Sequence, residues 1–330
     1  MSKSGTPTRE QIAGIKSNIL PVLKKVSTRA IKAWLKTRNL AATGSTEDQL
    51  ATRVAKHIAE GALKESVLED ALIGFEESSG KRVYLFKFEK KATGSWLPHR
   101  LSALSIPAPG KRKLAGDHPK PMTAVYSAVD GNVLRVKWAE EHTDVKLDPQ
   151  DKPVYTAVEK RIVLVADLNK GVAELRMDPP EARHSYTDAF GKTTEQTYYS
   201  AYRDKAAQLL DTALEKAELA KVIKALVAEE KPRVVRIHVD NHTGQTNFKW
   251  NVRGSRIDIR DDPEWQAHYK QFGHTWAWDS QSFHWLPEPS KGHLKRELFS
   301  HLDAVEGYLK VNADCSDEEV EYAIAQVRAR

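Results

Sequence analysis

Along the first sixty residues, apolar positions recur at steps of three and four, which is the spacing of an amphipathic helix. One apolar stripe consists of Ile31, Trp34 and Leu35. A separate row at the same spacing is basic and consists of Arg29, Lys32 and Lys36. A second apolar stripe repeats every four residues at Leu50, Val54 and Ile58. The pattern predicts two short helices that pack their apolar stripes together and leave a basic row facing solvent.

Residues at the ends of these two helices are typical of capping positions. Ser27 is a candidate N-cap for the first helix, and Thr46 with Gln49 has the spacing of a capping box at the start of the second. The tripeptide 43–45, Thr-Gly-Ser, lets the chain turn between them, and Gly61 is a candidate stop signal. The sequence therefore predicts a helix–loop–helix unit near the N-terminus.

After residue 80 the apolar positions alternate or run together, which favours strands. The candidate strands are 82–88, 123–129, 133–138, 161–167, 172–177, 234–239, 247–252 and 255–259. The tripeptide Asp130-Gly131-Asn132 predicts a hairpin turn, and Gly171 predicts another. Candidate helices are 8–20, which Pro21 is expected to end or kink, then 64–75, 195–230 with one break near Glu218, 291–311, and a last one from Ser316.

This order of elements predicts an α+β protein. We expect a small N-terminal helical domain followed by an antiparallel or mixed sheet with covering helices. Three domains are expected: 1–64, which is helical; 65–190, a helix plus a β-meander with a basic loop; and 191–330, an α/β region with a long helix, a hairpin and an aromatic cluster. Residues 92–121 are rich in Gly and Pro and are expected to form a long loop.

Positive charge is concentrated in two zones of the 330-residue chain, whose net charge is +6. Residues 1–60 hold 11 Lys or Arg and 4 Asp or Glu, a net charge of +7, so the other 270 residues sum to −1. Residues 81–113 hold 9 basic side chains and one acidic one, Glu89. Concentrated basic zones favour a polyanionic partner, because binding releases the counterions of a phosphate backbone.

The helix–loop–helix stretch resembles the SAP domain, a small module that binds double-stranded DNA with little sequence preference. The residues that carry this resemblance are Val26, Trp34-Leu35-Lys36, Arg38-Asn39-Leu40, Gly44, Leu50 and Arg53. Asn39 stands where the family often has Gly, and Asn tolerates the same left-handed backbone. The usual Lys after Gly44 is missing, with Thr46 and Glu47 nearby. The resemblance implies DNA contacts from the basic side chains of this unit.

The DNA-contacting residues that we expect come from both basic zones. They are Lys24, Lys25, Arg29, Lys32, Lys36, Arg38, Arg53, Lys111, Arg112 and Lys113. A Lys-Arg-Lys cluster on a loop can lie along a phosphate backbone, and it can equally be a solubilising surface, so both interpretations stay open for 111–113. DNA is the expected nucleic acid, and RNA stays open as well.

Residues 68–177 also resemble the layout of the CENP-N kinetochore family. The shared features are a helix that ends in the aromatic Phe75, a Val-Tyr-x-Phe-like strand at 83–86, a strand ending at Trp138, and a Pro-Val-Tyr strand entry at 153–155. This resemblance implies an α+β C-terminal part that pairs with a protein partner, and DNA binding through the N-terminal part.

Motifs for enzymatic chemistry are sparse. A metal-dependent nuclease of the PD-(D/E)xK type is the enzyme reading to test, with Glu89-Lys90-Lys91 and an upstream Asp70 as its match. Seven of the twelve histidines lie between His238 and His301, but no HExxH or compact carboxylate–histidine set is evident, so no metal site or cofactor is predicted. The single cysteine, Cys315, excludes an internal disulfide and precedes an acidic helix, which disfavours a reactive thiolate.

The aromatic residues between Trp265 and Trp285 have three interpretations. The preferred interpretation is that they form part of the core. They could instead stack on the bases of a single strand. In the third interpretation, Trp276 and Trp278 lie side by side on a face that binds a protein. No apolar run approaches the ~18 residues of a membrane span. We therefore expect a cytoplasmic, nucleoid- or chromatin-associated scaffold that binds double-stranded DNA and pairs with a protein through its C-terminal region. A nuclease or nuclease subunit is the first alternative, and a protein-interaction scaffold without a nucleic-acid role is the second.

Overall fold

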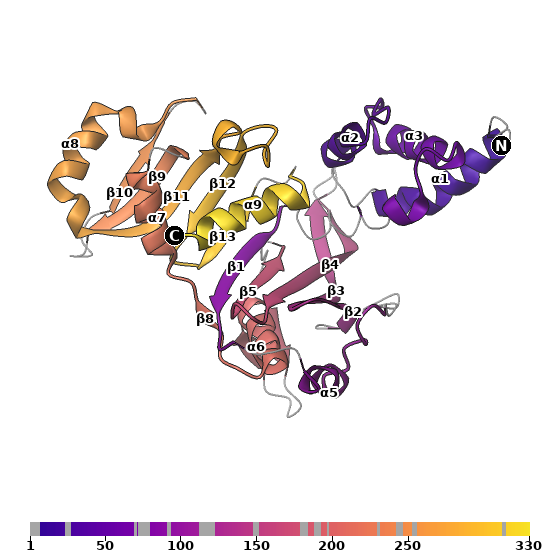
Figure 1. Ribbon diagram of the computed structural model, residues 1–330, viewed down its shortest axis with the longest axis horizontal. Helices are drawn as coiled ribbons and strands as arrows, with labels where there is room; N and C mark the ends of the chain where they lie inside the picture. Colours follow the sequence, from indigo (N-terminus) through magenta and orange to yellow (C-terminus); the bar gives the residue numbers. More distant parts are fainter. Residues whose placement is uncertain are drawn as a thin grey trace.

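The computed structural model shows an α+β protein, in which N-terminal helices precede a large antiparallel sheet with helices on both faces (Figure 1). The class predicted from the sequence is therefore confirmed. The structure describes residues 7–23, 28–68, 71, 80–90, 94–111, 123–147, 152–178, 184–187, 193–196, 198–229, 232–241, 247–252, 256–311 and 315–330. Within this part of the chain, none of the helices combines the length and the apolar character that a membrane crossing requires.

Three helices at the N-terminus share one apolar core. They are α1 (Arg9–Leu23), α2 (Thr28–Thr37) and α3 (Glu47–Ala59). Leu23, Ile31 and Leu35 are each at most 1% exposed, as is Val54 from α3. Helix α1 continues through Pro21 to Leu23, so Pro21 does not end it. Burial of Leu23 favours the last helical turn, although Pro21 cannot donate a hydrogen bond to it.

The sheet contains eleven of the described strands, all paired antiparallel, in the order β10-β9-β11-β12-β13-β1-β5-β4-β3-β2, with β8 beside β1. These strands are β1 (Arg82–Lys87), β2 (Thr123–Asp130), β3 (Val133–Leu147), β4 (Pro153–Asp167), β5 (Val172–Met177), β8 (Glu215–Lys216), β9 (Arg233–Asn241), β10 (Asn247–Asn251), β11 (Trp276–Trp285), β12 (Leu298–Asp303) and β13 (Tyr308–Val311). A separate two-stranded sheet joins β6 (His184–Thr187) and β7 (Thr193–Gln196).

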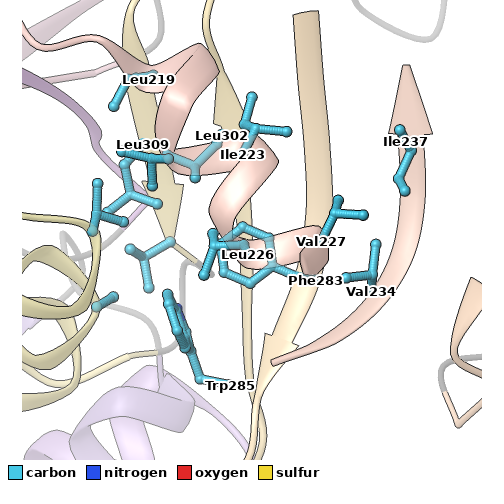
Figure 2. Close-up of a cluster of buried hydrophobic side chains, with 14 of the residues drawn as sticks. Leu219, Ile223, Leu226, Val227, Val234, Ile237, Phe283, Trp285, Leu302 and Leu309 are labelled. Atoms are coloured by element: carbon cyan, nitrogen blue, oxygen red, sulfur yellow. The ribbon is translucent and has the colours of Figure 1, made fainter. Parts of the chain in front are cut away.

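Strand β1 stands at the centre of this sheet and separates two apolar cores. Val83 and Leu85 point into one core, and the alternating Tyr84 and Phe86 point into the other, on the opposite face. The first core lies over β9 to β13 and is covered by α7 (Leu219–Ala228), α8 (Pro263–Phe272) and α9 (Asp317–Arg328). Figure 2 shows side chains of α7 packed against those of β9 and β11. The second core lies over β1 to β5 and is covered by α5 (Trp96–Ala103) and α6 (Tyr198–Leu210).

A buried ionic network joins the two halves of the sheet. Arg176 of β5 has no exposed surface and pairs with Glu174 at 2.7 Å and with Asp317 of α9 at 3.2 Å. Glu321 also pairs with Arg176, and Arg328 reaches Glu174 at 2.8 Å. Burial by itself lowers the pKa of Arg176, but Glu174, Glu321 and Asp317 outweigh this effect and raise the pKa. The sequence alone gave no sign of this network.

Several predicted turns are confirmed. Gly131, at a φ of 56°, lies in the hairpin turn between β2 and β3. Gly171, at a φ of 66°, connects β4 to β5, and a Cβ atom there would lie 2.4 Å from the carbonyl oxygen of Phe88. Ser316 caps α9 in a full capping box with Glu319, as the acidic start of the last helix indicated.

The structure also corrects four predicted segments. Residues 291–311 are not a helix: turns and bends at 291–297, after the 3-10 turn Glu288–Ser290, lead into β12 and β13. The expected helix 195–230 has the predicted break before Leu219, but the break is wider than expected: a turn at Asp211, with a φ of 51°, and strand β8 separate α6 from α7, and residues 195–196 belong to β7. The expected loop 92–121 contains α5, and the expected strand 255–259 ends in a 3-10 turn (Ile259–Asp261), whose N-cap is Asp258.

Candidate nucleic-acid interface

Helix α2 presents basic side chains to solvent. The helix has the sequence TRAIKAWLKT, which contains no acidic residue. Lys36 and the following Arg38 are exposed, and Lys32 is half-buried. Among the residues that the structure describes, no carboxylate lies within 4.0 Å of these three cations. Their charge is therefore available to an external anion.

Arg38 is held in place by an aromatic ring. Its guanidinium carbon lies 4.5 Å from the ring centroid of Trp34, which is a cation–π distance. Trp34 was expected in the core stripe with Ile31 and Leu35, but it is half-buried at the rim of the core. This stacking keeps a positive charge beside Lys36 at the C-terminal end of α2, where the helix dipole also favours cations.

The turn after α2 confirms the role predicted for Asn39. Asn39 has a φ of 55°, which is the left-handed region, and the Leu40 amide donates to the Leu35 carbonyl oxygen at 3.0 Å. This is the hydrogen bond of a Schellman C-cap, with Asn in the place that Gly usually takes.

Arg53 is occupied by the loop between α2 and α3. Its Nη2 donates to the Thr43 hydroxyl at 2.7 Å, and His57 Nε2 lies 3.0 Å from the Ala41 carbonyl oxygen. Gln49 accepts a hydrogen bond from the Ser45 amide at 2.7 Å. Together these contacts fasten the loop onto α3, so Arg53 positions the loop rather than extending freely into solvent.

The N-terminus of α3 is acidic, which disfavours a phosphate there. Thr46 caps the helix by accepting from the Gln49 amide, as predicted, but Gln49 Oε1 accepts from the Ser45 amide and not from the Thr46 amide, so the capping box is incomplete. Glu47 and Asp48 occupy the first turn, and Asp48 pairs with Lys16 of α1 at 2.7 Å. The available positive charge of this unit therefore lies on α2 and the turn after it.

Half of the expected contact residues have no described side-chain geometry. Arg29 lies within α2, although its side chain is not described. The others lie outside the described residues: Lys24, Lys25, Arg112 and Lys113. The capping role of Ser27 and the resemblance at Phe75 fall outside them too. Lys111 is exposed.

Half of the described cations in the second basic zone are engaged within the protein. Lys81 is 6% exposed, pairs with Asp178 at 2.8 Å and donates to the Arg161 carbonyl oxygen at 3.1 Å. The guanidinium carbon of Arg82 lies 4.4 Å from the ring centroid of Tyr308. The side chain of Arg100 in α5 pairs with that of Asp211. These three cations stabilise the sheet body, and Lys87, Lys90 and Lys111 remain exposed.

The described structure does not bring together the residues of the predicted nuclease motif. Glu89 and Lys90 are exposed beyond the end of β1, whereas Asp70 and Lys91 lie outside the described residues. No described geometry therefore assembles the predicted nuclease set.

A compact carboxylate–histidine set does exist, contrary to the expectation from the sequence. Ligand atoms of His238, Asp240 and Asp279 lie within 4.8 Å of one another. His238 and Asp240 alternate along β9, and Asp279 comes from β11, the neighbouring strand. Burial and the adjacent Asp240 carboxylate raise the pKa of Asp279 above its usual value. Sequence reasoning missed this set because it depends on the register between two strands.

The aromatic cluster belongs to the core, as expected. Trp265, Trp276, Trp278 and Trp285 are at most 5% exposed, and Phe283 is fully buried. Trp276 and Trp278 do point to the same face of β11, but their side chains are buried as part of the first core. The base-stacking and protein-binding interpretations of these rings are therefore wrong.

The thiol of Cys315 is buried. Burial, with a smaller contribution from the Glu319 carboxylate, raises the pKa of its thiol to about 12. The thiol is protonated at neutral pH, which agrees with the prediction that it is no reactive thiolate.

Comparison of the whole sequence with protein-family models and with curated proteins finds no match.

Proposed function

We propose that this protein binds double-stranded DNA through α2 and the turn that follows it, with little dependence on base sequence. The observation that carries the proposal is the row formed by Lys32, Lys36 and Arg38, which no described carboxylate neutralises. The resemblance of this unit to the SAP domain supports the same function. The acidic start of α3 directs the contact toward α2, because Glu47 and Asp48 repel phosphate.

Phosphate contacts give affinity without base specificity. Each phosphate that the protein neutralises contributes about −0.9 to the slope of log K against log salt concentration. The row holds no Asn or Gln for reading adenine, and Arg38 is stacked on Trp34, so we expect mainly charge contacts with phosphate from it. The proposal therefore implies steep salt dependence and similar affinities for unrelated duplexes of equal length.

Charge reversal on the row tests the proposal. The triple variant Lys32→Glu, Lys36→Glu, Arg38→Glu is titrated into a labelled short duplex, and binding is followed by fluorescence anisotropy at several salt concentrations. We expect the affinity to fall about 100-fold or more and the magnitude of the salt slope to drop by about 3. Thermal unfolding of the variant establishes that the core of α1 to α3 is intact.

A matched variant controls for net charge. It reverses three exposed lysines for which the described structure has no ion pair, namely Lys224, Lys270 and Lys295. Both variants have the same formal charge, so a drop of similar size in both would show bulk attraction and contradict a site on α2. Full-strength binding by the α2 variant would contradict it as well.

The same preparations distinguish the other two functions that the sequence left open. Cleavage of plasmid DNA with magnesium or manganese would indicate the nuclease. Absence of binding to both DNA and heparin in dilute buffer would leave the protein-interaction scaffold. We expect binding without cleavage.

A further inference from the structure

One face of the C-terminal half of the sheet is polar and carries ligand-type side chains. On β9, Val234, Ile237 and Val239 point into the first core, whereas His238 and Asp240 lie on the opposite face. Strand β12 alternates in the same way, with Leu298, Ser300 and Leu302 buried and with Phe299, His301 and Asp303 more exposed. The face that holds His238 is therefore turned away from the helices α7 and α9.

A β-bulge brings a third ligand to this face. Trp278 pairs with Val239 and Ser280 pairs with His238, so Asp279 is an extra residue between two register positions. The Asp279 carbonyl oxygen accepts a hydrogen bond from the Ala304 amide at 2.7 Å, which fastens the bulge to the β12–β13 turn. Bulges often re-aim a side chain, and this one places the Asp279 carboxylate beside His238 and Asp240.

The two carboxylates, which lie within hydrogen-bonding distance of each other, do not satisfy His238. His238 Nδ1 lies 3.9 Å from Asp279 Oδ2, which is too long for a hydrogen bond. The other ring nitrogen, Nε2, is buried without a hydrogen-bond partner in the described structure. The side chains of His238 and Asp279 are only 26% and 16% exposed. An imidazole with an unused nitrogen beside two closely spaced carboxyl groups offers ligand atoms that a cation would satisfy, because the cation would offset the repulsion between the carboxylates.

We propose that His238, Asp240 and Asp279 bind one divalent first-row transition-metal ion, such as Zn²⁺ or Mn²⁺. Metal–ligand bonds of about 2.0–2.2 Å separate ligand atoms by about 3–4 Å, so small side-chain rotations close the observed 4.8 Å spread. Imidazole nitrogen suits these ions better than Mg²⁺ or Ca²⁺, which prefer oxygen alone. Three protein ligands leave coordination positions for water or for an oxygen of an anionic ligand.

Isothermal titration calorimetry on the full chain, stripped with EDTA and then freed of chelator, tests the site with ZnCl₂ and MnCl₂. We expect one ion per chain for at least one of the two metals. Asp279→Asn and His238→Gln should each weaken that binding at least tenfold. Asn and Gln keep the approximate size of the side chains, and thermal melting without metal establishes that both variants are folded.

A control variant and titrations with Ca²⁺ and Mg²⁺ complete the experiment. His274 is an exposed histidine that does not belong to the set, so His274→Gln should leave the affinity unchanged within about twofold. Absence of stoichiometric binding for both Zn²⁺ and Mn²⁺ would overturn the proposal, and so would unchanged affinity in the two site variants. Preferential binding of Ca²⁺ or Mg²⁺ would overturn it as well. An equal loss in His274→Gln would also overturn it, since it would indicate adventitious binding to surface histidines. The α2 charge-reversal variant should bind metal normally, because the site does not depend on the proposed DNA contact.

Discussion

Two stretches of this protein carry a similar excess of positive charge, but the partners of their described cations differ. Residues 1–60 have a net charge of +7 and residues 81–113 a net charge of +8. In the first stretch Lys36 and Arg38 are exposed and have no described carboxylate partner. In the second, Lys81 is buried against Asp178, and Arg82 and Arg100 contact an aromatic ring and a carboxylate, while Lys87, Lys90 and Lys111 stay exposed.

The difference shows what a basic zone in a sequence can establish. A surplus of Lys and Arg indicates a polyanionic partner only where the fold leaves the charges unpaired and exposed. The sheet body buries cations because its strands bring carboxylates from distant parts of the chain next to them, as Arg176 illustrates with Asp317 and Glu321 of α9. We therefore expect mutations in the body to change stability and mutations on α2 to change DNA affinity.

The largest effect on stability is expected from Arg176→Met. Removing the cation leaves Glu174, which is 2% exposed, with Arg328 as its remaining ion pair among the described residues and with Arg135 nearby. Breaking a buried pair costs about 3 kcal/mol. Urea unfolding measures the change. Arg328→Met is the comparison, because Arg328 is 29% exposed and its loss should cost less than half as much. Equal costs for the two variants would contradict the dominant role of Arg176.

Lys81→Met should lower the free energy of unfolding by about 2 kcal/mol, less than Arg176→Met because the Asp178 side chain is 30% exposed and can be hydrated. Methionine keeps most of the side-chain length and removes the charge together with the hydrogen bond to the Arg161 carbonyl oxygen. DNA affinity should stay within about twofold of the original protein, since a charge already paired adds little to phosphate binding. A large loss of affinity without a loss of stability would place Lys81 at the DNA interface and remove the contrast between the two zones.

Lys111→Glu examines the exposed remainder of the second zone. We expect a three- to tenfold loss of DNA affinity, about 1 kcal/mol, and a salt slope smaller in magnitude by about 1, as for one phosphate contact. Unfolding should be unchanged, because Lys111 is exposed. An affinity equal to that of the original protein would assign 111–113 to the solubilising surface that the sequence left open.

The smallest change is expected for Arg53→Ala. It removes the hydrogen bond to Thr43 and should cost about 0.5–1 kcal/mol of stability. DNA affinity should fall less than for Lys36→Glu, because Arg53 holds the loop and Lys36 is free to meet phosphate. Anisotropy titrations of the two single variants compare them directly, and a greater loss for Arg53→Ala would make it a direct contact.

Local chemistry determined a good part of the fold from the sequence. Thr46 and Ser316 cap helices where short polar residues precede a helical period, and Gly131 turns a hairpin where a positive φ is needed. Asn39 takes the left-handed backbone at the end of α2. These features depend on neighbours within a few residues, so one sequence suffices to find them. The basic row on α2 was also predictable, because helical spacing alone places Lys32 and Lys36 on one face.

The tertiary structure decided whatever depends on strand pairing. Residues 291–311 have a period compatible with a helix, but β12 pairs with both β11 and β13, and burial in the sheet outweighs helix propensity. The turn signal was present in Asp303, which accepts from the Glu306 amide, and in Gly307, at a φ of 82°. The burial of Arg176 and the meeting of Asp279 with His238 have no local signal. They arise from register across neighbouring strands and from helix packing, which no stretch of sequence specifies by itself.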